Sequence, residues 1–184
     1  MSGRLALRGV LQPDWVVRGT VVTLPIARLR AMGIRGVVLD VDRTLLPRRC
    51  RLLPDPVRQW VRSAAVVMRL HLLSNNLDQD RIRWVGKELG LPGTAFARKP
   101  RRGKLRSVLA TMDLPPHQVA MVGDRILTDV VAGNRLGLWT VLVRSITCDG
   151  DICPHDRLQR LEKMISTGLG ADLRESLPQQ LHSL

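Results

Sequence analysis

The feature of this sequence that most restricts its fold is a regular alternation of short apolar runs with helix-length segments. Runs typical of strands occupy residues 36–40, 69–74, 118–124 and 139–143, with a shorter one near 93–97. Segments with helical spacing lie over residues 55–67, 102–112 and 127–136, and from a cap at Asn76 or Asp78 to Leu89. Strands that alternate with helices form parallel sheets covered on both faces. The sequence therefore predicts an α/β sandwich of three layers around a mainly parallel sheet.

The predicted domain has a segment on either side. A chain of 184 residues is long enough for one domain with a buried core, which we place at residues 34–168. Residues 1–33 are expected to form a helical or interfacial segment, because apolar side chains and arginines there fit either helices packed on the sheet or a membrane-surface element. An amphipathic helix is expected over residues 156–166, with an apolar stripe inward and basic residues in solvent. Residues 169–184 are expected to form a polar tail.

The sequence lacks the signals of a secreted or membrane-spanning protein. Arginines interrupt every apolar run well short of a transmembrane length, and the first residues lack a secretory signal. Three cysteines, Cys50, Cys148 and Cys153, have no CxxC spacing and are expected to be reduced thiols. We therefore expect a cytoplasmic location, with or without peripheral attachment to the inner face of the membrane.

The charge of the chain indicates anionic partners. Its 29 Lys and Arg residues against 16 acidic ones give a formal net charge of +13. Such a chain attracts nucleic acid, anionic lipid or phosphorylated substrates. One Phe and no Tyr leave no stacking platform for single-stranded nucleic acid, and no helix-turn-helix or zinc-finger pattern occurs. We expect a phosphorylated substrate and no nucleic acid, and we infer no obligate protein partner.

Polar side chains gather where three of the predicted strands end. These are Asp40, Asp42 and Thr44 after the first strand, Ser74, Asn75 and Asn76 after the second, and Asp124 and Asp129 after the third. Lys99 lies in the loop before a predicted helix. Ligands of open parallel sheets bind at this edge. Clustered acids in so basic a chain require a counter-charge, which a divalent cation with oxygen ligands supplies.

This combination of groups suits phosphoryl transfer through an aspartyl phosphate. One carboxylate attacks phosphorus and forms an acyl phosphate, which water then hydrolyses. A second carboxylate, two residues further on, protonates the leaving oxygen and later takes a proton from the water. A hydroxyl and backbone N–H groups hold the phosphate, while a lysine and a metal ion balance its charge.

The motifs resemble those of the haloacid dehalogenase (HAD) superfamily of phosphatases. "DVDRT" is similar to its nucleophile motif DxDxT, "LLSNN" to its second motif, "ARKP" to its lysine motif and "VGDRILTD" to its metal motif GDxxxxD. Their order and spacing fit over about residues 34–144. More narrowly, "LPDPVRQW", "SNN" and "GDRILTDVVAGNRLG" resemble the YqeG-like branch, which includes phosphatidylglycerophosphate phosphatases. The resemblance implies a HAD-like Rossmannoid fold.

The resemblance also implies catalytic and phosphate-binding roles. Asp40 would be the nucleophile, Asp42 the general acid and base, and Lys99 the charge that stabilises the transition state. The implied phosphate-binding residues are Thr44, Ser74, Asn75 and Arg43. Arg43 stands where the YqeG-like branch usually has Asn, and it would place a positive charge beside the nucleophile and alter substrate preference.

The same resemblance implies a Mg²⁺ site. Asp40, Asp124 and the backbone carbonyl of Asp42 would bind the ion, and Asp129 would support the site.

The spacing of the motifs leaves no room for a cap domain. The stretches from Thr44 to Ser74 and from Ser74 to Lys99 each hold one crossover helix and little more, so neither common cap insertion point is filled. An open site suits a phosphate presented on a large carrier, such as a phosphomonoester on an anionic membrane. We therefore expect a Mg²⁺-dependent phosphatase that converts phosphatidylglycerophosphate to phosphatidylglycerol. The alternatives are a HAD phosphatase for soluble nucleotide, sugar or protein phosphates, and a catalytically silent basic binding module.

Overall fold

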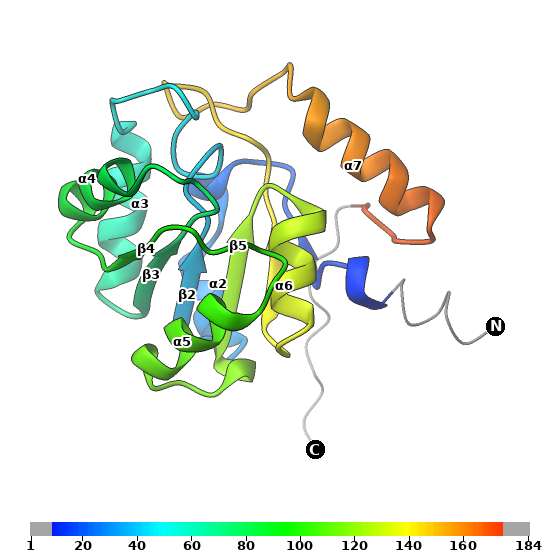
Figure 1. Ribbon diagram of the computed structural model, residues 1–184, viewed down its shortest axis with the longest axis horizontal. Helices are drawn as coiled ribbons and strands as arrows, with labels where there is room; N and C mark the ends of the chain where they lie inside the picture. Colours follow the sequence, from blue (N-terminus) through cyan, green and yellow to red (C-terminus); the bar gives the residue numbers. More distant parts are fainter. Residues whose placement is uncertain (1–8, 175–184) are drawn as a thin grey trace.

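A six-stranded, wholly parallel sheet forms the centre of the molecule (Figure 1). The structure is a computed structural model that describes residues 9–174. The strand order is β1–β6–β5–β2–β3–β4. The strands are β1 (Trp15–Val16), β2 (Gly36–Leu39), β3 (Arg69–Leu73), β4 (Gly93–Thr94), β5 (Val119–Gly123) and β6 (Trp139–Leu142). The predicted parallel sheet is confirmed, and the described residues contain no inserted cap domain.

Helices cover both faces of the sheet. The α-helices are α2 (Ile26–Ala31), α3 (Asp55–Ala65), α4 (Gln79–Leu89), α5 (Gly103–Met112), α6 (Val131–Asn134) and α7 (Arg157–Gly168). Short 3-10 turns occur at η1 (Val21–Thr23) and η2 (Pro116–Gln118), and η3 (Ile126–Val130) is a π-helix. No helix within residues 9–174 is long and apolar enough to cross a bilayer.

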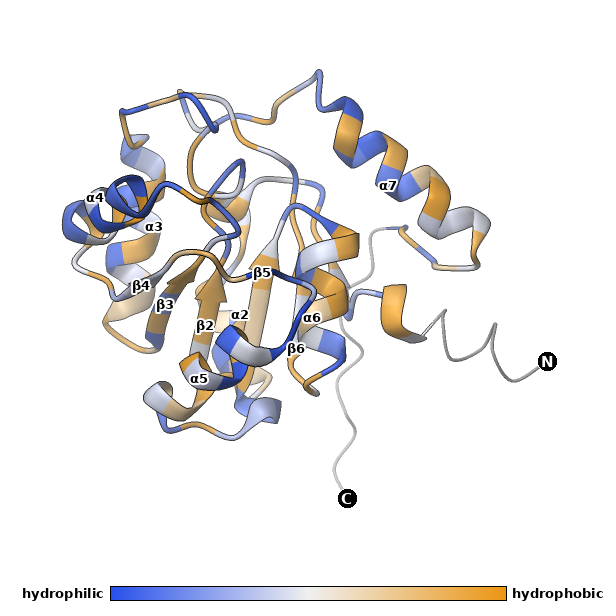
Figure 2. Ribbon diagram, viewed as in Figure 1, coloured by the Kyte–Doolittle hydropathy of each residue, from blue (hydrophilic) through white to orange (hydrophobic). Residues whose placement is uncertain are grey.

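The alternation of side chains along β2 divides the core into two layers. Val37 and Leu39 pack with the apolar residues of α2, α3 and α4, whereas Val38 packs with those of α5 and α6. All three side chains are fully buried. Successive strand residues point to opposite faces, so a strand covered on both sides is apolar throughout. Figure 2 shows this hydrophobic character in β2 and β5.

The predicted boundaries of helix α4 follow its capping residues. Asp78 caps the start of the helix, where its side chain accepts a hydrogen bond of 2.9 Å from the backbone N–H of Arg81. Gly90 ends the helix in the left-handed conformation, with φ of 66°. Glycine adopts this conformation without the steric penalty that a Cβ imposes.

The segment before β2 begins with a strand, where a helical or interfacial segment was expected. Trp15 and Val16 form an edge strand that pairs with β6, and both side chains are buried. Between β1 and β2, α2 is the one α-helix, and its Leu29 is fully buried in the core. These apolar side chains pack on the sheet rather than facing a membrane. Residues 1–8 and 175–184 of the expected terminal segments lie outside the described residues.

The helix predicted after β5 begins with a π-helix instead of an α-helix. Within it, Asp129 accepts a hydrogen bond of 3.2 Å from the backbone N–H of Arg125. Its carboxylate lies over Gly123, where an added Cβ would come within 2.3 Å of Asp129 Oδ2. Wider turns of this kind are frequent at functional sites. Here the turn brings an acidic side chain back over the end of β5.

Replacing Gly123 by alanine should therefore destabilise the fold. The new Cβ must displace the Asp129 carboxylate, and overpacking of this kind lowers the free energy of unfolding by about 1–3 kcal/mol. Gly103→Ala is the matched control, because a Cβ added at Gly103 would meet no neighbouring side chain within 4 Å. Urea unfolding of both variants tests this expectation. Equal stability of Gly123→Ala and wild type would contradict the described position of Asp129.

Candidate active site

The carboxyl ends of β2, β3 and β5 border one open cavity. Its polar wall combines the acids that follow β2, the amides that follow β3, and basic side chains from several loops. The lining residues are Asp40, Asp42, Arg43, Arg48, Ser74, Asn75, Asn76, Lys99, Arg125, Thr128 and Leu158. The sequence-based expectation that these strand ends converge is met in the geometry.

Asp40 is held at this cavity by two side chains. Its Oδ1 lies 2.6 Å from Lys99 Nζ, and its Oδ2 accepts a hydrogen bond of 3.2 Å from Thr44 Oγ1. The backbone N–H of Asp40 donates to the carbonyl of Val122 in β5. Both ends of the carboxylate are therefore fixed, while the side chain still borders the cavity.

Lys99 Nζ lies close to three buried oxygens. Besides Asp40, Nζ contacts Asp129 Oδ1 at 2.7 Å and donates to the carbonyl of Leu73 at 2.8 Å. Burial alone would lower the pKa of Lys99, but Asp129 and Asp40 outweigh it and raise that pKa. The Asn75 side chain holds the Lys99 backbone from both sides, through bonds of 2.9 and 2.7 Å. Lys99 is thus a fixed ammonium ion.

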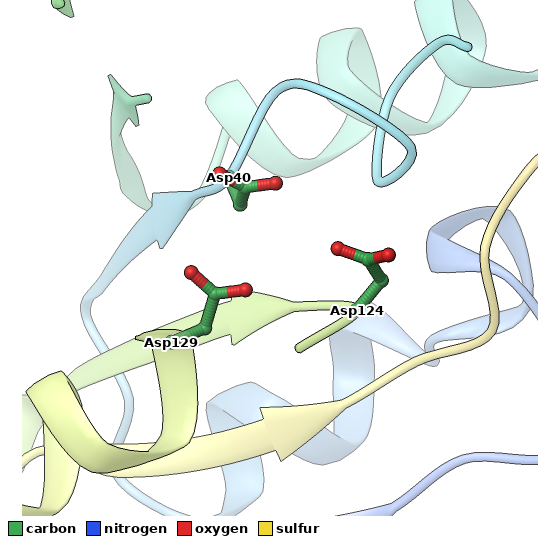
Figure 3. A group of neighbouring side chains, drawn as sticks. All are labelled: Asp40, Asp124 and Asp129. Carbon is green, nitrogen blue, oxygen red and sulfur yellow. The ribbon is translucent and has the colours of Figure 1, made fainter. Parts of the chain in front are cut away.

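Asp40, Asp124 and Asp129 form a buried acidic cluster (Figure 3). Each offers a carboxylate oxygen, and these oxygens lie within 4.8 Å of one another. Burial raises the pKa of Asp40 to about 6, against the opposing effect of Lys99. Burial, with Asp40 and Asp129 nearby, also raises the pKa of Asp124 well above its ordinary value. The Lys99 ammonium pairs with Asp40 and Asp129, whereas Asp124 accepts a hydrogen bond from Ser145.

The acidic cluster fits a divalent cation. Asp124 is fully buried, and its Oδ2 accepts a hydrogen bond of 2.9 Å from Ser145, but its Oδ1 has no partner among the described residues. A buried carboxylate oxygen without a donor is costly, and a hard cation such as Mg²⁺ takes oxygen ligands of this kind. The residues present therefore suit Mg²⁺.

Asp42 is positioned by Asn76, which the sequence places at the same strand ends, and by Arg81, which the sequence analysis did not single out. Asn76 Nδ2 donates to Asp42 Oδ2 at 2.7 Å, and Arg81 Nε lies 3.1 Å from Asp42 Oδ1. Arg81 also donates to the carbonyls of Cys50 and Pro47, at 2.7 and 2.9 Å. The sequence did not predict these contacts. Arg81 lies in the first turn of α4, and no spacing links it to Asp42.

Two of the predicted phosphate-binding residues, Thr44 and Arg43, form side-chain contacts within the protein. Thr44 is fully buried and does not line the cavity, and its hydroxyl is bonded to Asp40 instead. Arg43 borders the cavity, but its guanidinium donates to both oxygens of Asp156, at 3.0 and 3.1 Å. The positive charge expected beside Asp40 is therefore paired with a carboxylate from the start of α7. Ser74 and Asn75 do line the cavity.

Comparison with known proteins gives the class of this chain. Residues 96–159 match a family described as HAD-hydrolase-like. The chain is 28% identical over 165 residues to the probable phosphatase YqeG of Bacillus subtilis, covering 89% of this chain and 94% of YqeG. It is 34% identical over 134 residues to the chloroplastic phosphatidylglycerophosphate phosphatase 1 of Chlamydomonas reinhardtii, covering 67% of this chain and 49% of the algal protein.

A solved structure has the same fold. An uncharacterized protein from Listeria monocytogenes serotype 4b superposes with a TM-score of 0.52 at 17% identity, covering 67% of this chain and 84% of that protein. With its parallel sheet and motif order, the chain belongs to the HAD superfamily of hydrolases. Within that superfamily it is a phosphatase related to YqeG and to the phosphatidylglycerophosphate phosphatases.

We expect Mg²⁺ to stabilise the protein, and more strongly as the pH rises. Below a pH of about 6 the raised pKa of Asp40 favours its protonated form in the metal-free fold, and protons then compete with the ion. In the metal-free protein this group contributes stability at low pH that is lost as the pH rises through 6. Thermal unfolding with and without Mg²⁺, from pH 5 to pH 8, measures the difference.

Asp124→Asn is the informative variant for the same measurement. It removes the carboxylate whose Oδ1 has no partner, so we expect the metal-free variant to unfold at a higher temperature than wild type and to lose the Mg²⁺ effect. Asp55 is an exposed residue at the start of α3, so Asp55→Asn is the control. It should retain the wild-type unfolding temperature without metal and the wild-type Mg²⁺ effect. A Mg²⁺ effect of equal size in Asp124→Asn would contradict the assignment of this site.

Proposed function

We propose that this protein is a Mg²⁺-dependent phosphomonoester hydrolase that acts through an aspartyl phosphate on Asp40. The observation that carries the proposal is the fixation of the Asp40 carboxylate by Lys99 and Thr44 at an open, basic cavity. A nucleophile needs a defined orientation toward the atom that it attacks. Both contacts supply that orientation from within the buried side of the site.

Asp42 would transfer the protons of the reaction. It borders the same cavity two residues beyond Asp40, and Asn76 and Arg81 fix its two oxygens. In the first step it would donate a proton to the alcohol oxygen that leaves phosphorus. In the second step it would accept a proton from the water that attacks the acyl phosphate.

The remaining polar groups would bind the phosphate and its charge. Ser74 borders the cavity, and its Oγ accepts a hydrogen bond from the backbone N–H of Asn76, which leaves the hydroxyl proton for a ligand. The Lys99 ammonium, which contacts Asp40, would stabilise the charge of the transferred group. Asp40, Asp124 and the Asp42 carbonyl would hold Mg²⁺, with Asp129 in support, and the bound ion would offset the negative charge of the phosphoryl group.

We further propose that the substrate is phosphatidylglycerophosphate and that the enzyme works at the inner face of the membrane. The open cavity, the excess of arginine and the names of several relatives support this substrate. A soluble nucleotide, sugar or protein phosphate is the alternative substrate class. A silent binding module is disfavoured physically, because four clustered acids, two of which line the cavity, destabilise a fold that makes no use of them.

Asp40→Asn should abolish turnover while leaving the protein folded. Loss of the nucleophile is expected to lower kcat by at least about 10³-fold. Phosphate release is measured from phosphatidylglycerophosphate in mixed micelles with Mg²⁺, with p-nitrophenyl phosphate and glycerol phosphates as soluble comparisons and Asp55→Asn as the control. Activity confined to the soluble esters would overturn the lipid assignment and retain the mechanism. Turnover by Asp40→Asn near the wild-type rate would overturn the mechanism.

Arg81→Met should lower kcat more than it raises KM. Without the guanidinium, one oxygen of Asp42 loses its partner, so proton transfer from a fixed position is impaired by about tenfold to a hundredfold. Arg83→Met on the same helix is the matched control, because Arg83 is exposed and pairs with Asp80 instead. Steady-state kinetics on p-nitrophenyl phosphate separate the two parameters. Equal kcat values in the two variants would show that Arg81 does not position Asp42.

A further inference from the structure

Helix α7 packs against the domain through polar side chains, the reverse of the expected arrangement. Gln159, Glu162 and Ser166 are its buried residues. Gln159 Nε2 donates to the carbonyls of Asp124 and Val143, at 2.7 and 2.9 Å. Glu162 accepts from Arg125 Nε at 2.8 Å and from the backbone N–H of Ile126 at 3.0 Å. Gln159 and Glu162 are therefore hydrogen-bonded within the domain, whereas the hydroxyl of Ser166 has no partner among the described residues.

The outward side of α7 carries large apolar residues. Leu161, Met164, Ile165 and Leu169 are 48%, 67%, 42% and 45% exposed, and we call them the α7 apolar face. Helical spacing places Leu161 and Ile165 on one stripe, with Met164 and Leu169 beside it. Figure 2 shows hydrophobic and hydrophilic bands alternating along this helix at the periphery of the molecule. A helix of a globular domain normally buries such a stripe, so this face is available to a partner.

The α7 apolar face adjoins the mouth of the active site. Leu158, one turn before Leu161, lines the cavity that contains Asp40. Arg157 and Arg160 are exposed on the same helix, and Arg48 and Arg125 border the cavity. The loop before α3 and the loop before α7 lie at the same end of the molecule as α7 (Figure 1), and they expose Leu52 and Ile152. Leu158, Arg48 and Arg125 thus line the cavity, and further exposed apolar side chains lie at the same end of the molecule.

We propose that the α7 apolar face docks on an anionic phospholipid membrane and holds the active-site mouth at the headgroup layer. This inference rests on the proposed function, because it explains how an open site meets a lipid phosphate. Amphipathic helices bind membrane surfaces by inserting apolar side chains while basic residues contact anionic lipids. Charge complementarity and continuity with the cavity select this partner. The proposal differs from the interfacial segment expected over residues 1–33, whose Trp15 and Val16 are buried.

The test uses the full chain with Leu161→Ser combined with Met164→Ser (L161S/M164S), which removes apolar surface at constant charge. Val66→Ser with Val67→Ser (V66S/V67S) is the matched control. Both valines are exposed and precede the amino-terminal end of β3, whereas the active site lies at the carboxyl ends of the strands. Thermal unfolding verifies that the variants fold, and Met164→Ser alone replaces the double variant if needed. Flotation measures binding to vesicles of phosphatidylcholine with phosphatidylglycerol.

We expect wild type and V66S/V67S to bind these vesicles equally. We expect the affinity of L161S/M164S for them to be lower by at least about tenfold. Equal binding by L161S/M164S, or no binding by wild type, would overturn the proposal. So would a change in oligomeric state by light scattering with unchanged vesicle binding, because a second copy would then cover the face. Flotation needs no turnover, so a failure of the proposed lipid substrate, read from phosphate release, remains distinguishable from a failure of docking.

Discussion

The buried ion pairs of Lys99 are the interactions on which the rest of the site depends. The ammonium forms ion pairs with Asp40 and Asp129 at 2.6 and 2.7 Å and donates a hydrogen bond to the carbonyl of Leu73. Buried charges are tolerated only when their attraction and hydrogen bonding are complete. Through its two ion pairs and its bond to Leu73, Lys99 joins the ends of β2 and β3 to the π-helix. Asp124 lacks such pairing, because its Oδ1 has no partner among the described residues, and an unpaired buried carboxylate oxygen of this kind suits a cation.

Most of the site could be predicted because it follows from a simple rule of parallel sheets. Asp40, Ser74 and Asp124 each follow a buried apolar strand, and such strand ends meet at one edge. The positions of Thr44 and Arg43 were harder to predict, because a motif fixes neighbours along the chain but not where each side chain points. The contact of Arg81 with Asp42 depends on the path of a connecting loop, which leaves no periodic signal.

Two features of the fold could not be predicted from the sequence patterns: the first strand and the side of α7 that is buried. The strand Trp15–Val16 is too short to show a period of two, and its pairing with β6 depends on a distant part of the chain. Helix α7 was correctly predicted as amphipathic, but its polar side faces the domain because Gln159 and Glu162 satisfy backbone groups around Asp124 and Arg125. A hydrophobic pattern alone cannot reveal which side is buried when polar partners are available. As a result, the polar side of α7 contacts the residues that follow β5, and its apolar side is exposed.

The central claim is that Asp40 becomes phosphorylated during turnover, and trapping that species tests it most directly. Borohydride reduces an acyl phosphate on aspartate to homoserine, and the reduced residue survives proteolysis and mass spectrometry. Protein quenched during turnover of a phosphomonoester with Mg²⁺ should contain homoserine at position 40, and protein without substrate should not. Steady turnover with an unmodified Asp40, or with homoserine at Asp42 instead, would contradict the account.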